Sequence, residues 1–233
     1  MTHTDERHPS SGTGQASLPA LPARLAAVFF SPGRLMRQLT GTPAWLGALF
    51  VSAAVVGLSM LLIPAELFIE AQREAALERG VELPEMTERA MLAMRIVIPT
   101  TMVVVTLAMS FFFAGLYTVI FAFVLGDEGR YVQYLAAVTH AWFIAALFGL
   151  LVTPLRISTG DPQLTLNLGS FFFFLPDGYF LNVLRVLDLT QIWSTLVIAQ
   201  GAHAIDRRRS FGSATAILLV ILVGVALVVG RFT

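Results

Sequence analysis

The 233-residue chain contains no cysteine and no lysine, and charged residues make up only 13% of it. Without cysteine it can form no disulfide, no thiolate nucleophile and no cysteine-ligated zinc or iron–sulfur site. A soluble domain carries about 25% charged residues, so a composition that is 56% apolar excludes an ordinary soluble protein. The formal net charge of zero offers no basic surface for nucleic acid, and we expect no nucleic-acid partner.

Motifs that mark common active sites are also missing. The sequence has no His-Glu-x-x-His, no Gly-x-Ser-x-Gly and no phosphate-binding loop of the Gly-x-x-x-x-Gly-Lys type. The glutamates Glu66, Glu70, Glu74 and Glu78 recur every four residues, which predicts a solvated helix face rather than the oxygen cage that calcium needs. We therefore expect no enzymatic activity, no cofactor and no metal site.

Long apolar stretches separate the few charged residues. Five uncharged gaps follow one another, at residues 38–65, 96–126, 131–155, 189–205 and 210–230. A helix needs about 20 apolar residues to cross a bilayer, so only the 17-residue gap at 189–205 requires a span that starts earlier. The predicted fold is an all-α membrane bundle of five transmembrane helices, at residues 44–63, 96–124, 131–155, 180–204 and 213–230.

The chain ahead of the first span has two parts. Residues 1–20 are too polar to bury much surface, which predicts a disordered tail before a membrane domain at residues 21–233. Between residues 22 and 40, apolar residues recur at helical spacing, with Arg24, Arg34 and Arg37 on the other side. This amphipathic pattern predicts short interfacial helices whose arginines contact lipid phosphates. A cap packed on the bundle, without a lipid role, fits the pattern equally well.

Between the first two spans, the pattern predicts a helical hairpin outside the membrane. The glutamate stripe continues the first helix as far as Gly80, and Pro84-Glu85 opens a second helix with an acidic first turn.

Three ionisable residues, His140, Arg185 and Asp188, stand out inside the predicted spans, where a charge costs about 2.5–3.5 kcal/mol to insert. Arg185 and Asp188 are three residues apart on one predicted helix, so they can pair. At 1.5 Å of rise per residue, the depths of His140 and Asp188 differ by only about 5 Å. His140 could therefore meet Asp188 or Gln191 near mid-membrane. This candidate polar cluster could relay protons or hold a cation, and a purely structural hydrogen-bonded histidine is the alternative.

The arginines also indicate an orientation. Arg207, Arg208 and Arg209 lie in one of the shortest loops, where the preference of basic residues for the cytoplasmic side is strongest. We therefore place this loop and the amino terminus in the cytoplasm, and the three arginines become further candidates for contact with lipid phosphates.

Four short motifs occur in order along the chain: VFFSPGR at 28–34, TPAW at 42–45, VLGDEGRY at 124–131 and LDLTQIW at 187–193. Together they resemble the bacterial branch of the Yip-domain (Ypt-interacting protein) family, whose members are five-span membrane proteins. The first two look like the helix ahead of that branch's first span, the third like its turn between spans two and three, and the fourth like the opening of its fourth span. The resemblance covers about residues 24–230.

The resemblance implies a membrane protein that is not an enzyme. We predict an integral protein of the bacterial cytoplasmic (inner) membrane that acts as a scaffold or adaptor. Its partners would be membrane lipid, another membrane protein or a second copy of itself. Eukaryotic relatives associate with Rab-type GTPases, but this chain lacks the Asp-Leu-x-Gly-Pro element that such relatives carry, so we expect no GTPase partner. A small transporter or ion pathway that uses His140, Arg185 and Asp188 is the alternative function.

Overall fold

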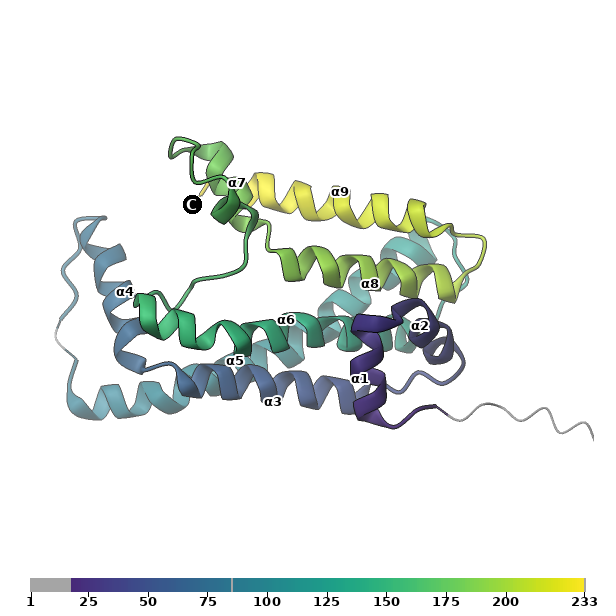
Figure 1. Ribbon diagram of the computed structural model, residues 1–233, viewed down its shortest axis with the longest axis horizontal. Coiled ribbons are helices and arrows are strands. Elements are labelled where there is room, and N and C mark those ends of the chain that lie inside the picture. The colour runs from purple at the N-terminus through teal and green to yellow at the C-terminus, as the bar shows by residue number, and fades with distance from the viewer. Residues whose placement is uncertain (1–17, 85, 233) are drawn as a thin grey trace, which may run out of the picture.

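The computed structural model describes residues 18–84 and 86–232, and within them the chain is helical with one isolated β-bridge (Figure 1). The predicted disordered tail lies largely outside the described residues. The elements are α1 (Leu21–Phe30), α2 (Pro32–Gly41), α3 (Leu46–Leu62), α4 (Ala65–Leu77), α5 (Glu88–Thr118) with the π-helical continuation η1 (Val119–Val124), α6 (Tyr131–Thr159), the 3-10 turn η2 (Leu168–Phe171), α7 (Tyr179–Val186), α8 (Leu189–Ile205) and α9 (Phe211–Val229).

Five long helices, α3, α5, α6, α8 and α9, lie side by side as a bundle (Figure 1). The central helix is α6, which packs against α3, α5 and α8, while α9 packs on the far side of α8. At one end of the bundle, α1 and α2 lie across α6 and α8, and at the other end lie α4, α7 and the carboxyl terminus.

Three helices are long and apolar enough to cross a membrane: Glu88–Val124, Tyr131–Thr159 and Phe211–Val229. The pair α3 and α4 would make a fourth if the two were counted as one broken span. Many large apolar side chains point outward from the bundle, among them Phe50, Phe112, Leu151, Val220 and Val228. Such a surface is unfavourable in water and suited to lipid, so the chain is a membrane protein.

The prediction that the first helix continues through the glutamates was wrong. The helix α3 ends at Leu62, and α4 leaves it at an angle of 78°. The break falls at Ile63-Pro64 because proline offers no backbone N–H and disfavours a helical residue before it. The second helix of the predicted hairpin starts later than Pro84, at Glu88, where the side chain of Thr87 accepts a hydrogen bond from the backbone N–H of Ala90. Glu85 lies outside the described residues.

The predicted single helix over residues 180–204 was also wrong, because it is broken into α7 and α8 at Leu187-Asp188. The backbone at Asp188 is extended, and its carboxylate caps α8 by accepting from the N–H groups of Thr190 and Gln191. On the other side of the break, Leu187 and Leu189 exchange backbone hydrogen bonds with the loop at Leu168 and Leu166. The break is thus satisfied by a cap and a short strand-like pairing, as buried backbone groups require.

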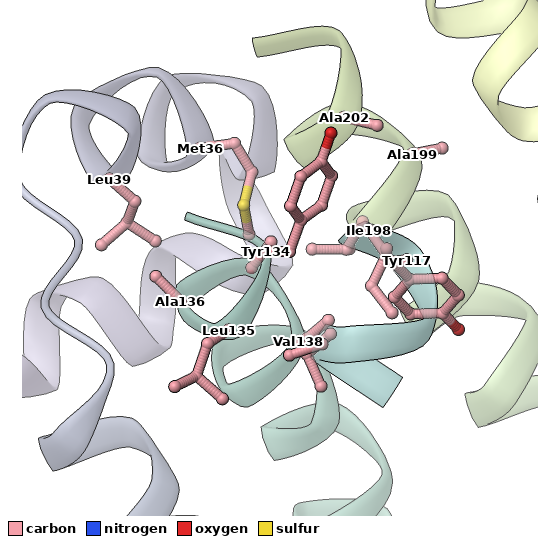
Figure 2. Packing of buried hydrophobic residues seen from close by; sticks show 14 of the residues in the cluster. Met36, Leu39, Tyr117, Tyr134, Leu135, Ala136, Val138, Ile198, Ala199 and Ala202 are labelled. Atoms are coloured by element: carbon pink, nitrogen blue, oxygen red, sulfur yellow. The ribbon is translucent and has the colours of Figure 1, made fainter. Parts of the chain in front are cut away.

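The main core lies where α2, α6 and α8 meet (Figure 2). Met36 from α2, Tyr134 and Val138 from α6, and Ile198 and Ala202 from α8 are all buried there. Small residues bring α6 and α8 close together. A Cβ atom added to Gly201 would lie only 2.8 Å from the Cβ atom of Ala137 and 3.4 Å from Sδ of Met36. Only glycine fits at this helix contact without moving a neighbour.

We expect the substitution Gly201→Leu to force α8 away from α6 and α2 and to lower the free energy of unfolding by about 1–3 kcal/mol, as overpacking of a core does. Thermal unfolding of the purified protein in detergent measures the change. Gly224→Leu is the matched control, because a Cβ atom at Gly224 has nothing within 4 Å. Equal unfolding midpoints for the two variants would contradict the close contact.

Candidate functional site

The break before α8 lies beside a pocket of about 190 Å³ between α6 and α8. Its wall on α6 is apolar and formed by Ala145, Phe148, Gly149 and Val152. A Cβ atom added to Gly149 would meet nothing within 4 Å, so the space over this residue is open. The side of the pocket formed by the second half of α6 is therefore apolar.

The rim of this pocket is polar and carries both signs of charge. Arg156 comes from the last turns of α6, and Asp188, Thr190 and Gln191 come from the start of α8. Although Arg156 and Asp188 line one pocket, no ion pair within 4.0 Å joins them. The site therefore holds a cation and an anion apart, with an apolar wall below them.

Arg156 is 9% exposed, which is unusual for an arginine. Its Nε donates to the backbone oxygen of Leu164 at 2.9 Å, in the loop that folds back after α6. This is the one hydrogen bond that the side chain of Arg156 forms with the described part of the chain, so its two terminal amino groups are left with their donors unused.

Only one of the two carboxylate oxygens of Asp188 accepts hydrogen bonds from the described residues. Its Oδ1 accepts from the N–H of Thr190 at 2.7 Å, from the N–H of Gln191 at 3.2 Å and from the Thr190 hydroxyl. Its Oδ2 has no hydrogen-bond partner within residues 18–84 and 86–232. An unused acceptor therefore sits on the same rim as the unused donors of Arg156.

The structure brings together only part of the predicted polar cluster. Asp188 and Gln191 share the pocket, but Arg185 lies on α7, where it is exposed and pairs with Asp177 at 3.1 Å. The expected pairing of Arg185 with Asp188 does not form, because the helix that was to hold both is broken between them. The cation beside Asp188 is Arg156, which sequence spacing did not indicate, since only the fold of residues 160–168 brings the two helix ends together.

His140 lies apart from the pocket. It is fully buried on α6, and its Nδ1 donates to the backbone oxygen of Ala136 in the same helix at 2.8 Å. Its Nε2 has no partner in the described part of the chain, and no hydrogen bond links the ring to Asp188 or Gln191. This arrangement fits the structural reading of the histidine.

The six arginines predicted to contact lipid phosphates lie at one end of the bundle, in different surroundings. Arg34 and Arg37 project from the exposed face of α2, opposite its buried face, and Arg207 is exposed in the loop after α8. Arg24 is half-buried and donates to the backbone oxygen of Ala44 at 3.0 Å. Lipid contact by these residues stays a prediction.

The last two arginines, Arg208 and Arg209, form ion pairs that sequence analysis missed. Nη2 and Nε of Arg209 donate to the two carboxylate oxygens of Asp127, at 2.6 and 2.8 Å. Both side chains are mostly buried, with 16% of Arg209 and 7% of Asp127 exposed. The two-pronged contact fixes the loop after α5 to the loop after α8. The available signal was one acidic and one basic turn at the same end of the predicted bundle.

Asp206 strengthens the same junction. Its carboxylate accepts from the guanidinium group of Arg208, with Nη2 at 3.0 Å, and from the backbone N–H groups of Glu128 and Arg208. These hydrogen bonds, that of the Arg208 side chain first, hold the pKa of Asp206 well below its ordinary value. In turn, Asp206 raises the pKa of the Arg208 side chain.

Comparison with known proteins decides the family. A family model of the Yip1 domain matches residues 26–230, which include the second half of α1 and all later helices. The chain belongs to the Yip1 family. The resemblance seen in the sequence is thereby confirmed at the level of the family, which is one of membrane proteins without enzymatic activity. No curated protein and no solved structure matches the chain.

We expect removal of either member of the Asp127–Arg209 pair to destabilise this Yip1-family protein, because the charge that remains loses its partner in a mostly buried site. Asp127→Ala and Arg209→Ala should each lower the free energy of unfolding by about 1.5–3 kcal/mol, and the double variant should lose less than the sum. Chemical denaturation in detergent measures the coupling. Arg207→Ala should have little effect, and additive losses would contradict the pair.

Stability should also depend on pH through Asp206. Because its pKa is lowered in the folded state, the carboxylate stabilises the fold above the pKa of an unfolded aspartate, about 4, and this stabilisation is lost as the pH falls below that value. We expect Asp206→Asn to lower the melting temperature at pH 7 and the deficit to shrink below pH 4. Glu74→Gln, on the exposed face of α4, is the control. A deficit that is constant with pH would argue against this assignment.

Proposed function

We propose that this Yip1-family protein is a non-catalytic scaffold or adaptor of the bacterial cytoplasmic membrane, crossed five times, with its amino terminus in the cytoplasm. It would act through contacts with lipids or with a partner protein. The observation that carries the proposal is the outer surface of the bundle, where large apolar side chains are exposed on the long helices. Such a protein contacts the lipid acyl chains with the apolar sides of its helices and exposes its polar and charged groups at the two ends of the bundle.

Two of the five proposed spans are short. The helices α3 and α8 have 17 residues each, which at 1.5 Å per residue gives about 25 Å. This is the lower end of the length range for membrane-spanning helices. Their position supports the assignment, because both lie alongside α6 within the bundle.

The charges at the two ends support the orientation. Arg34, Arg37 and Arg207 are exposed at the end that carries α1, α2 and the short loops. Exposed glutamates at 70, 74 and 78 lie at the opposite end, on and just after α4. Exposed arginines occur at both ends, so the orientation rests on the short loop that holds Arg207, Arg208 and Arg209, because the preference of basic residues for the cytoplasmic side is strongest in short loops.

The alternative of an ion pathway has lost support. His140, Arg185 and Asp188 lie on separate elements, and no hydrogen bond joins any two of them. A proton relay needs groups within hydrogen-bond reach or a chain of water between them.

Labelling of single cysteines tests the topology, and the natural absence of cysteine removes any background. We expect a membrane-impermeant maleimide to label Glu78→Cys, Gln163→Cys and Arg231→Cys in intact spheroplasts, because these positions would lie outside. Glu128→Cys and Arg207→Cys should be labelled only after permeabilisation. All five positions are exposed in the structure.

Two outcomes would contradict the proposal. Labelling of positions 163 and 207 from the same side would mean that α8 does not cross the membrane. The reverse pattern at all five positions would invert the orientation. The unsubstituted protein, which has no thiol, controls for non-specific labelling.

A further inference from the structure

We propose that the pocket between α6 and α8 binds the head group of a phospholipid that carries both a phosphate and a primary ammonium group. The inference rests on the proposed membrane insertion, because the ligand would enter from the surrounding bilayer. It is carried by the separation of opposite charges on one rim above an apolar wall.

The phosphate would bind at Arg156. The terminal amino groups of this buried side chain have no hydrogen bond to the described residues, while its Nε is held by the backbone oxygen of Leu164. A guanidinium group fixed at one nitrogen presents its two remaining amino groups in a plane that matches two phosphate oxygens. The acidic residues whose charges act on Arg156 are Asp161 and Asp188, and neither satisfies it by direct contact.

The ammonium group would bind at Asp188. Oδ1 of this residue is occupied by the cap of α8, whereas Oδ2 is left without a partner among residues 18–84 and 86–232. An ammonium group with N–H donors can satisfy Oδ2, and a trimethylammonium group cannot, because it has no N–H. A head group with a net negative charge would be repelled by the carboxylate. The rim therefore favours an ethanolamine head group over choline and glycerol head groups.

The apolar wall would take the start of an acyl chain. From Arg156 to Ala145 the helix rises by about 16 Å, along Val152, Gly149 and Phe148. The cavity of about 190 Å³ is smaller than the 300–1,000 Å³ that drug-sized ligands occupy. It can hold a head group and a short length of chain, so the rest of the lipid must lie outside, against exposed residues such as Leu151 and Leu155.

Native mass spectrometry of the purified full-length protein tests the proposal, with phosphatidylethanolamine, phosphatidylcholine and phosphatidylglycerol of identical acyl chains as probes. We expect phosphatidylethanolamine to bind about tenfold more tightly than either of the others. Arg156→Gln should weaken its binding by about tenfold or more, which is the effect of losing a charge-assisted hydrogen bond. Soluble phosphoethanolamine should compete poorly, because it lacks the chain that the apolar wall accepts.

Two further variants separate the parts of the site. Asp188→Asn keeps an oxygen that can cap α8 but removes the negative charge, so it should abolish the preference for ethanolamine over choline. Gly149→Leu should fill the pocket and reduce binding of all three lipids, and it keeps the test valid if Arg156→Gln does not fold. Arg185→Gln, outside the pocket, is the matched control and should bind as the natural protein does.

Equal retention of the three lipids, tighter binding of phosphatidylglycerol, or binding unchanged in both Arg156→Gln and Gly149→Leu would each overturn the proposal. Competition by soluble phosphoethanolamine as strong as that of the lipid would also overturn it, since the site would then bind a free head group. Cysteine labelling that supports five spans, together with no preference for phosphatidylethanolamine, would reject the site and leave the proposed topology standing.

Discussion

The burial of α6 on several sides is the packing on which the bundle depends. This helix contacts α3, α5 and α8 along its length and α1 and α2 near its start. Inside a lipid belt, association is driven by close packing rather than by exclusion of water, so small residues at the contacts matter most. The tight approach of Gly201 to Ala137 is one such contact. Large side chains such as Tyr134 and Met36 fill the space between these close contacts, and many other large apolar side chains face outward.

The same environment constrains where the helices may break. Backbone groups that leave a helix at membrane depth need partners within the protein. At Asp188 the partners are its own carboxylate and the loop at Leu166 and Leu168. At Ile63-Pro64 the chain turns by 78° into a helix that carries three glutamates, which places the break near the edge of the apolar bundle. Breaks are therefore local solutions to hydrogen bonding, and the one at Asp188 also creates the pocket rim.

The spacing of charges along the sequence was enough to locate most of the helices of the bundle. It placed the helices around residues 131–155 and 213–230 within a few residues, because their ends coincide with charged turns. It could not detect the break at Asp188, since a count of uncharged residues ignores whether a charged residue lies in a helix or caps one. The motif LDLTQIW held the cue, an aspartate two residues before a threonine and three before a glutamine, which suits a helix start.

The candidate site was less predictable because its partners meet only through the fold. Arg156 and Asp188 are brought to one rim by the loop of residues 160–168, and no sequence period relates them. At the other end of the bundle, Asp127 and Arg209 were free to pair directly and did so. On the pocket rim, the Leu164 carbonyl and the cap of α8 hold each charge in place without bringing them together. Charged groups that are held in place but not paired keep hydrogen-bond donors and acceptors that a bound molecule can use. The directly paired charges of Asp127 and Arg209, in contrast, contribute to the stability of the fold.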